Sequence, residues 1–397
     1  LNATSTTLQG TITINSGATL AQNSTGSVTD LHISGPVILA GGGTLSLSNT
    51  SVNRIYGSGS DSLTNNATIQ GSGQLGINGG STYAFALTNN GTIVANQSAA
   101  LQIAPSSTVT NTGTLRAAAG STLNVIGGYT QTAGDTNILG TLSVTGGPLV
   151  AGGGTLSGSG TSTISGGFSL TGSFTKLDSG TTTISGPQIF SSGTTLNVNG
   201  GMVKFNVTSG SVTVGTGVSA NIAAGATLEL AGSVSALASG SNRVNIVNSS
   251  AAPGILVSGT NQVVGGIDGL GNVQVNAGSD LTANHIVENA LVIGGTSTSH
   301  GRVTIDASDA SGNPLAKSGF VLAGSLQSDV PFATGTSSSW NALETSEMPA
   351  GSAGIFLASA YSAGSASAMP EPSSVVLCLL GLASIAVFSS RRAKNEP

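Results

Sequence analysis

Carboxylates and histidines are the residue types most often used for acid–base catalysis and metal binding. Residues 1–316 contain ten carboxylates, most of them tens of residues apart. Asp268 and Glu288 are separated by about one repeat of the chain, and glycosidic hydrolysis needs two carboxyls within ~10 Å of each other. We interpret this pair as part of a solvated coil edge and predict no catalytic residue. The ten carboxylates are Asp30, Asp61, Asp135, Asp178, Glu229, Asp268, Asp280, Glu288, Asp306 and Asp309.

Metal-ligand spacings are equally sparse. His32, His285 and His300 show no two-His zinc spacing, and we interpret His285 and His300 as surface residues. Asp306 and Asp309 precede a glycine, but the D-x-D-x-D-G pattern of a calcium loop is missing. We therefore predict no metal site and no cofactor.

The composition excludes several classes of protein. Only 6% of the residues are charged, against about 25% in a typical soluble domain, whereas glycine occupies 60 positions. The formal net charge is −5, and the main body has no basic patch for nucleic acid. Most polar chemistry needs side chains that are scarce here, so the composition argues against a conventional globular enzyme.

Short units recur along most of the chain before its C-terminal part. Thr88–Ile93 (TNNGTI) returns as Thr110–Leu115 (TNTGTL), and Ser162–Gly166 (STISG) returns as Thr182–Gly186 (TTISG). Each unit alternates apolar and polar residues and ends at Gly or Asn, which indicates short strands and sharp corners. These spacings give a period of about 20 residues, which is typical of a solenoid.

Three all-β folds are consistent with such strands: sandwiches, a propeller and a right-handed parallel β-helix. The period is too short for a propeller blade of ~40–45 residues, and sandwiches usually have strands every ~8–12 residues with larger aromatic cores. We predict the right-handed parallel β-helix, a β-solenoid of about 14 or 15 coils, with stacked sandwiches as the main rival. Backbone pairing between coils then replaces the salt bridges and aromatics that the chain lacks.

We predict three regions. Residues 1–316 form the β-solenoid, in which 281–316 are its last coils or a cap. Residues 317–368 are a Ser-, Ala- and Gly-rich linker, although Phe320, Val321 and Leu322 argue against complete disorder. Residues 369–397 form a separate tail. The chain begins at Leu1 without a recognisable signal peptide, so we expect a processed or partial sequence.

The tail has three consecutive parts. Residues 369–374 include Pro370, Glu371, Pro372 and Ser373, and residues 373–390 contain no charge, which predicts a single transmembrane helix. Arg391, Arg392 and Lys394 lie in the basic end 391–397, which should remain cytoplasmic. An ordinary C-terminal membrane anchor is the alternative.

This order of parts resembles the PEP-CTERM sorting signal of Gram-negative bacteria, and the resemblance covers only 369–397. It implies export, transient anchoring in the inner membrane and processing near Pro370–Pro372 by an exosortase-type enzyme. The body resembles the repeats of autotransporters and filamentous adhesins, but the chain has no terminal membrane barrel, so this likeness concerns the fold alone.

These features lead to one functional hypothesis and one alternative. We expect an exported, non-catalytic structural or adhesive protein of the cell surface or extracellular matrix. Extracellular polysaccharide is its expected partner, nucleic acid is not, and open solenoid edges make self-association a further hypothesis. The alternative is a carbohydrate-active β-helix enzyme, either a polysaccharide lyase or a glycoside hydrolase, with an acidic or basic cluster in one groove.

Overall fold

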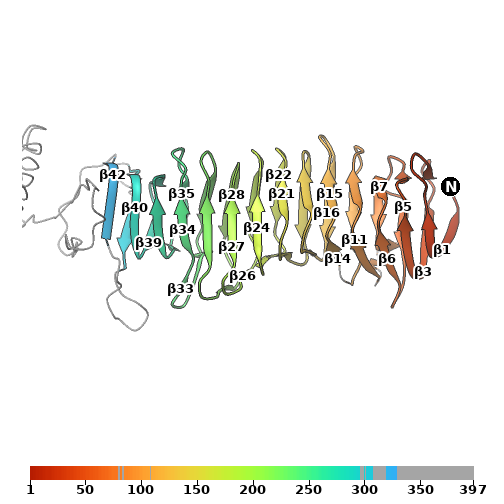
Figure 1. Cartoon of the computed structure of the whole chain (residues 1–397), viewed down its shortest axis with the longest axis horizontal. Helices are drawn as coiled ribbons and strands as arrows, with labels where there is room; N and C mark the ends of the chain where they lie inside the picture. Colours follow the sequence, from red (N-terminus) through yellow and green to blue (C-terminus); the bar gives the residue numbers. More distant parts are fainter. Residues whose placement is uncertain are drawn as a thin grey trace, which may run out of the picture. The chain divides into compact units, whose positions relative to one another are not determined.

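The computed structural model of the chain describes residues 1–306, apart from 79–80, 83–84, 108, 296–298 and 300, together with the backbone of 319–328. These residues form a parallel β-solenoid of about 13 turns, with no helix. Figure 1 shows the coils following one another from β1 to β42. The all-β solenoid prediction is thereby confirmed.

Each coil contributes one strand to each of three faces, and a strand pairs in parallel with the equivalent strand of the next coil. The first two coils begin with long strands, β1 (Ser5–Thr13) and β3 (Thr29–Ala40), that turn the corner between faces A and B. The long strands β40 (His285–Ile293) and β42 (Gly319–Ser328) turn the corner between faces C and A.

The remaining strands are listed by face. Face A contains β5 (Asn53–Tyr56), β8 (Gly73–Leu75), β13 (Leu101–Ile103), β16 (Thr122–Ile126), β19 (Thr141–Thr145), β22 (Thr161–Ile164), β25 (Thr181–Ile184), β28 (Met202–Val207), β31 (Thr227–Gly232), β35 (Ile255–Val257) and β38 (Asn272–Val275). Face B contains β6 (Ser62–Asn65), β11 (Ala86–Asn89), β14 (Val109–Asn111), β17 (Tyr129–Gln131), β20 (Leu149–Ala151), β23 (Phe168–Leu170), β26 (Gln188–Phe190) and β29 (Val212–Val214), and β36 (Gln262–Val263), β39 (Asp280–Ala283) and β41 (Arg302–Ile305) take the same place in later coils.

Face C contains β2 (Thr19–Gln22), β4 (Thr44–Leu47), β7 (Thr68–Gly71), β12 (Thr92–Ala95), β15 (Thr114–Ala117), β18 (Asp135–Ile138), β21 (Thr155–Ser157), β24 (Ser173–Lys176), β27 (Thr195–Val198), β30 (Ser219–Ile222), β34 (Asn245–Asn248) and β37 (Gly266–Gly269). Two short hairpins leave the coils, β9 (Ile77–Asn78) with β10 (Ser81–Thr82) and β32 (Ala238–Ser239) with β33 (Asn242–Arg243).

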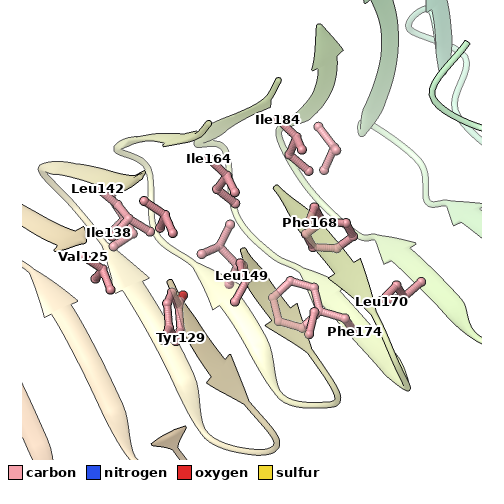
Figure 2. Packing of buried hydrophobic residues seen from close by; sticks show 14 of the residues in the cluster. Val125, Tyr129, Ile138, Leu142, Leu149, Ile164, Phe168, Leu170, Phe174 and Ile184 are labelled. Carbon is pink, nitrogen blue, oxygen red and sulfur yellow. The ribbon is translucent and has the colours of Figure 1, made fainter. Parts of the chain in front are cut away.

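The core lies inside the coils because successive side chains of a strand point to opposite faces of the sheet. Most short strands therefore alternate between a buried and a partly exposed residue, as in Thr92–Ala95. Figure 2 shows Leu142, Leu149 and Ile164 pointing into the space enclosed by the strands. Farther along, Phe168 packs edge-to-face against Phe174, Phe190 and Phe205, with ring centroids 6.1 to 6.5 Å apart.

A ladder of amides runs through the interior at the end of the face B strands. Asn65 Nδ2 donates to Asn89 Oδ1 and Asn89 Nδ2 donates to Asn111 Oδ1, both at 2.8 Å. All three residues have no exposed surface. The ladder satisfies polar groups that burial would otherwise leave unpaired.

Stacked glycines allow the coils to approach closely at the corner after this ladder. A Cβ on Gly113 would lie 2.1 Å from the carbonyl oxygen of Gly91, and one on Gly134 would lie 2.0 Å from that of Gly113. Gly134 also has a φ of 68°, which residues with a side chain rarely adopt. The abundance of glycine follows in part from these contacts.

The structure differs from the predicted boundaries in two respects. Strand β42 pairs with β40 from Gly319 to Ser328, so the solenoid continues into the region predicted as a linker. There are about 13 turns instead of 14 or 15, since many coils are longer than the predicted period, both near the N-terminus and between residues 202 and 257. Asp30, for example, pairs with Arg54, whereas the more closely spaced Thr141 and Thr161 pair farther along. Strands β39, β40 and β41 pair in parallel with strands of neighbouring coils.

Candidate functional site

Five pairs of oppositely charged groups among the described residues join strands of different coils, and three of these pairs lie within residues 243–306. Other charged residues, such as Asp61, Arg116 and Asp135, belong to none of the five pairs. Four of the pairs have nitrogen–oxygen distances between 2.5 and 3.0 Å, and the fifth has 3.6 Å. The five pairs are Asp30–Arg54, Lys204–Glu229, Arg243–Asp306, Asp268–His285 and Asp280–Arg302. The two members of each pair come from different coils, so the pairs contribute to packing between coils.

Asp268 and Glu288 come from neighbouring coils, as their spacing suggested, but they point in opposite directions. Asp268 is in register with Val287, and Glu288 is the next residue of β40. The side chain of Asp268 is 42% exposed and forms a hydrogen bond with His285 Nε2 at 3.0 Å. Glu288 is 1% exposed and faces the interior. The interpretation of Glu288 as a solvated edge residue is therefore wrong, and the two carboxyls do not share a groove.

Glu288 has an unusual environment for a carboxylic acid. Neither oxygen has a hydrogen-bond partner among the described residues, although the Asn248 amide and the Gly271 N–H lie close enough to favour the ionised form somewhat. Desolvation outweighs these two effects, and together with the negative charge of Asp268 it raises the pKa of Glu288 to about 7. The side chain thus changes charge near neutral pH.

Asp306, the described member of the Asp306 and Asp309 pattern, forms an ion pair with Arg243. Arg243 Nη2 donates to Asp306 Oδ2 at 2.5 Å, and Arg243 Nη1 donates to Asn284 Oδ1 at 2.6 Å. Arg243 and Asn284 border an open polar hollow of about 220 Å³ that Thr216 and Asn245 also line. The hollow contains no group of three metal-ligating side chains, and none occurs elsewhere among the described residues.

The pair Asp30–Arg54 is the best-buried bidentate contact of the described body. Arg54 donates from Nε at 2.7 Å and from Nη2 at 2.8 Å to the two oxygens of Asp30. Such a pair is stronger than an exposed one because both the fork geometry and the low exposure favour it. We expect a double-mutant cycle of Asp30→Asn and Arg54→Gln to give a coupling energy of about 1 to 2 kcal/mol in thermal unfolding.

The matched control for that cycle is Asp280–Arg302, whose nitrogen–oxygen distance is 3.6 Å and whose Arg302 side chain is 78% exposed. Exposed pairs contribute about 0 to 1 kcal/mol, so this cycle should give less than half the coupling. Equal coupling energies in the two cycles would show that burial of the Asp30–Arg54 pair has no energetic role.

Uncharged hydroxyl and amide groups occupy most of the outward positions of the coils. On face C, parallel register places five threonines one above another. They are Thr19, Thr44, Thr68, Thr92 and Thr114. Thr64, Thr88, Thr110 and Thr130 form a similar row on face B. The body therefore presents repeated neutral polar rows, whose spacing the sheets determine.

Several predicted residues lie outside the described part of the chain. These are His300, Asp309, the predicted membrane span 373–390, and the sorting residues Pro370, Glu371, Pro372, Ser373, Arg391, Arg392 and Lys394. Among the described residues, no helix is long and apolar enough to cross a membrane.

Sequence reasoning missed several interior polar residues. The Asn65–Asn89–Asn111 ladder had a visible signal, because the repeated Thr-Asn-x-Gly-Thr unit places Asn89 and Asn111 at the same point of the coil. Lys176 had none. It is buried, its Nζ donates to the carbonyl oxygens of Leu177 and Asp178, and desolvation lowers its pKa.

No family model, curated protein or solved structure matches the chain.

Proposed function

We propose that this chain is a non-catalytic structural or adhesive protein, exported to the cell surface or the extracellular matrix. The observation that carries the proposal is the repetition of uncharged hydroxyl and amide rows over a solenoid of about 13 turns. Because only 6% of the residues are charged, long-range electrostatic steering contributes little to recognition. Weak contacts repeated on many coils add up when the partner is itself a polymer, such as extracellular polysaccharide.

The C-terminal residues are the basis for the proposed route of export and sorting. We propose that 369–397 act as a PEP-CTERM-like signal, in which 373–390 form one membrane-spanning helix in the inner membrane and Pro370–Pro372 are recognised by an exosortase-type enzyme. The support is the order of motif, apolar run and basic end in the sequence. The proposal also includes a right-handed winding of the solenoid.

The route predicts that the Pro-Glu-Pro motif controls processing. In a host with the sorting enzyme, replacing Pro370, Glu371 and Pro372 by alanine should leave the full-length chain in the membrane fraction, while the wild-type chain is shortened and reaches the surface. Cell fractionation with immunoblotting and protease treatment of intact cells measures both outcomes. Pro331→Ala is the control, because it removes a proline outside the motif. Unchanged processing of the triple variant would exclude the motif as the signal.

One observation favours the alternative, a carbohydrate-active β-helix enzyme. Asp268 touches His285 on the outer side of the solenoid, and a carboxylate beside a histidine is an arrangement used in acid–base catalysis. Its support is weaker, because the second carboxylate of this region, Glu288, faces the interior. Release of reducing ends or unsaturated sugars from polysaccharides, lost in Asp268→Asn, would replace the adhesive proposal with this one.

A further inference from the structure

Four consecutive strands of face A, β16, β19, β22 and β25, present two straight columns of outward side chains. The strands are in direct register without a bulge. The first column is Thr122, Thr141, Thr161 and Thr181, and the second is Asn124, Ser143, Thr163 and Thr183. We call these eight residues the threonine grid. Their neighbours in the strands, such as Leu142 and Ile164, point inward and are buried.

The geometry of the threonine grid is determined by the solenoid. Neighbouring coils lie about 4.8 Å apart, and two residues of a strand on the same side lie roughly 6.6 Å apart. The inward residues Leu142, Val144 and Ile164 have no exposed surface, so the strands are held by close packing on their other side. Figure 2 shows Leu142 and Ile164 on this inner side. A ligand that binds here meets a surface that is already ordered, which lowers the entropic cost of binding.

The threonine grid also has unused hydrogen-bonding capacity. None of its eight side chains forms a hydrogen bond with another described residue, although each carries a hydroxyl or an amide. Outward side chains on face C differ, because Asn137 donates to Ser157 at 2.8 Å and Asn221 donates to Asn197 at 2.9 Å. The grid can therefore exchange water for an external polar partner without breaking contacts within the protein.

Charge indicates which partner fits. The grid contains no charged residue, and the second column ends at Lys204, whose Nζ is bound to Glu229 at 2.9 Å. An anionic polymer would therefore gain little electrostatic binding energy at the grid. A single neutral hydrogen bond contributes about 1 kcal/mol net, so a small sugar would bind weakly, whereas a chain spanning several coils would add such contacts together.

We propose that the threonine grid binds a neutral polysaccharide whose chain lies across β16, β19, β22 and β25. The site rests on the proposed adhesive function and specifies its ligand class and location. A crystalline water lattice is the competing partner for a regular hydroxyl array. The mixture of Asn124, Ser143 and Thr163 in the second column interrupts the repetition of identical hydroxyls, which favours the varied hydroxyl positions of a sugar chain over a strictly repeating water lattice.

The test uses the full chain in detergent and the variant Thr141→Val/Thr161→Val/Thr163→Val/Thr181→Val. Valine retains the β-branched shape that suits a strand and removes the hydroxyl. The matched control is Thr64→Val/Thr88→Val/Thr110→Val/Thr130→Val, which removes four hydroxyls from the single row on face B. Affinity is measured for a β-glucan, a galactomannan, dextran, glucose and alginate, with thermal melting as the folding check.

We expect the wild-type chain to bind at least one of the three neutral polysaccharides, more tightly with increasing chain length and independently of salt. The grid variant should bind about tenfold more weakly or worse, and the control variant within about twofold of wild type. If the grid variant does not fold, Thr163→Lys, which places one charge in the middle of the grid, should give the same loss.

Three results would overturn this site. They are no binding to any neutral polysaccharide, an equal loss in the two valine variants, and ice-crystal shaping that the grid variant loses while the wild type binds no glycan. Surface localisation of the chain is measured separately by cell fractionation. A failed binding test with correct localisation would therefore remove the glycan site and leave the exported structural protein.

Discussion

Asn89→Ala should lower the free energy of unfolding by about 3 to 4 kcal/mol. Asn89 has no exposed surface and connects two neighbours, accepting from Asn65 and donating to Asn111, both at 2.8 Å. It also donates to the carbonyl oxygen of Thr114 at 3.0 Å. Alanine would leave Asn111 Oδ1 and its surroundings unsatisfied inside the core and would create a small cavity. Thermal unfolding, together with hydrogen exchange of the face B strands, measures the loss.

The neighbouring Asn90 supplies a matched control. It is exposed, and its Nδ2 donates to Asn66 Oδ1 at 3.0 Å on the outside of the same corner. Asn90→Ala removes the same amide from the next position and should cost less than about 1 kcal/mol, as most surface substitutions do. Similar losses for Asn89→Ala and Asn90→Ala would show that the interior ladder does not stabilise the solenoid.

Glu288→Gln should stabilise the last coils at pH 8 by about 2 kcal/mol, once partial screening by water is allowed for, and should change little at pH 4. Burial raises the pKa of Glu288 from 4.5 to about 7. Between these two values the folded chain binds more protons than the unfolded chain, so the wild-type stability falls as the pH rises. Below pH 4.5 the carboxyl is neutral in both the folded and the unfolded state, so its burial does not lower the free energy of unfolding through ionisation. The glutamine variant cannot ionise at this position. Its free energy of unfolding should therefore vary less between pH 4 and pH 8 than that of the wild type.

Hydrogen exchange in β37 and β40 at pH 5 and pH 8 reports this change locally, which matters because long repeat arrays do not always unfold in one step. Glu229→Gln is the control, since Glu229 accepts hydrogen bonds from Lys204 at 2.9 Å and from Ser258 at 2.6 Å. Removing that charge breaks a pair and should give no stabilisation at pH 8. A wild-type chain whose β40 is equally protected at both pH values would contradict the buried, unpaired state of Glu288.

Much of the fold was predictable because a solenoid repeats its local chemistry in every coil. Thr88–Ile93 and Thr110–Leu115 recur with the period of the coil, and Ser162–Gly166 lies beside Thr182–Gly186 in the described structure. Within each unit the apolar residue of the alternation, Ile164 or Ile184, is buried in the core. These predictions needed only residue types and short spacings, since both strand direction and corner position depend on local sequence.

The predictions that failed concerned which side of the sheet a residue occupies and how many residues each coil contains. Spacing correctly brought Asp268 and Glu288 into neighbouring coils, but one residue of register decides whether a side chain faces water or the core. The strand Gly319–Ser328 was assigned to a linker because Ser, Ala and Gly dominate its surroundings. Its position depends on pairing with β40, a strand much earlier in the chain, which a local pattern does not reveal.

The stacking of short, nearly uncharged strands follows from the amino-acid sequence, because alternation, glycine corners and repeated units are local properties. The sequence also contains the tail on which the proposed route depends, independently of the body. The folded chain establishes which polar residues lie inside, namely Asn65, Asn89, Asn111 and Glu288, and which outward rows lie side by side as the threonine grid. Both outcomes follow from the register between coils, which results from packing over the whole turn.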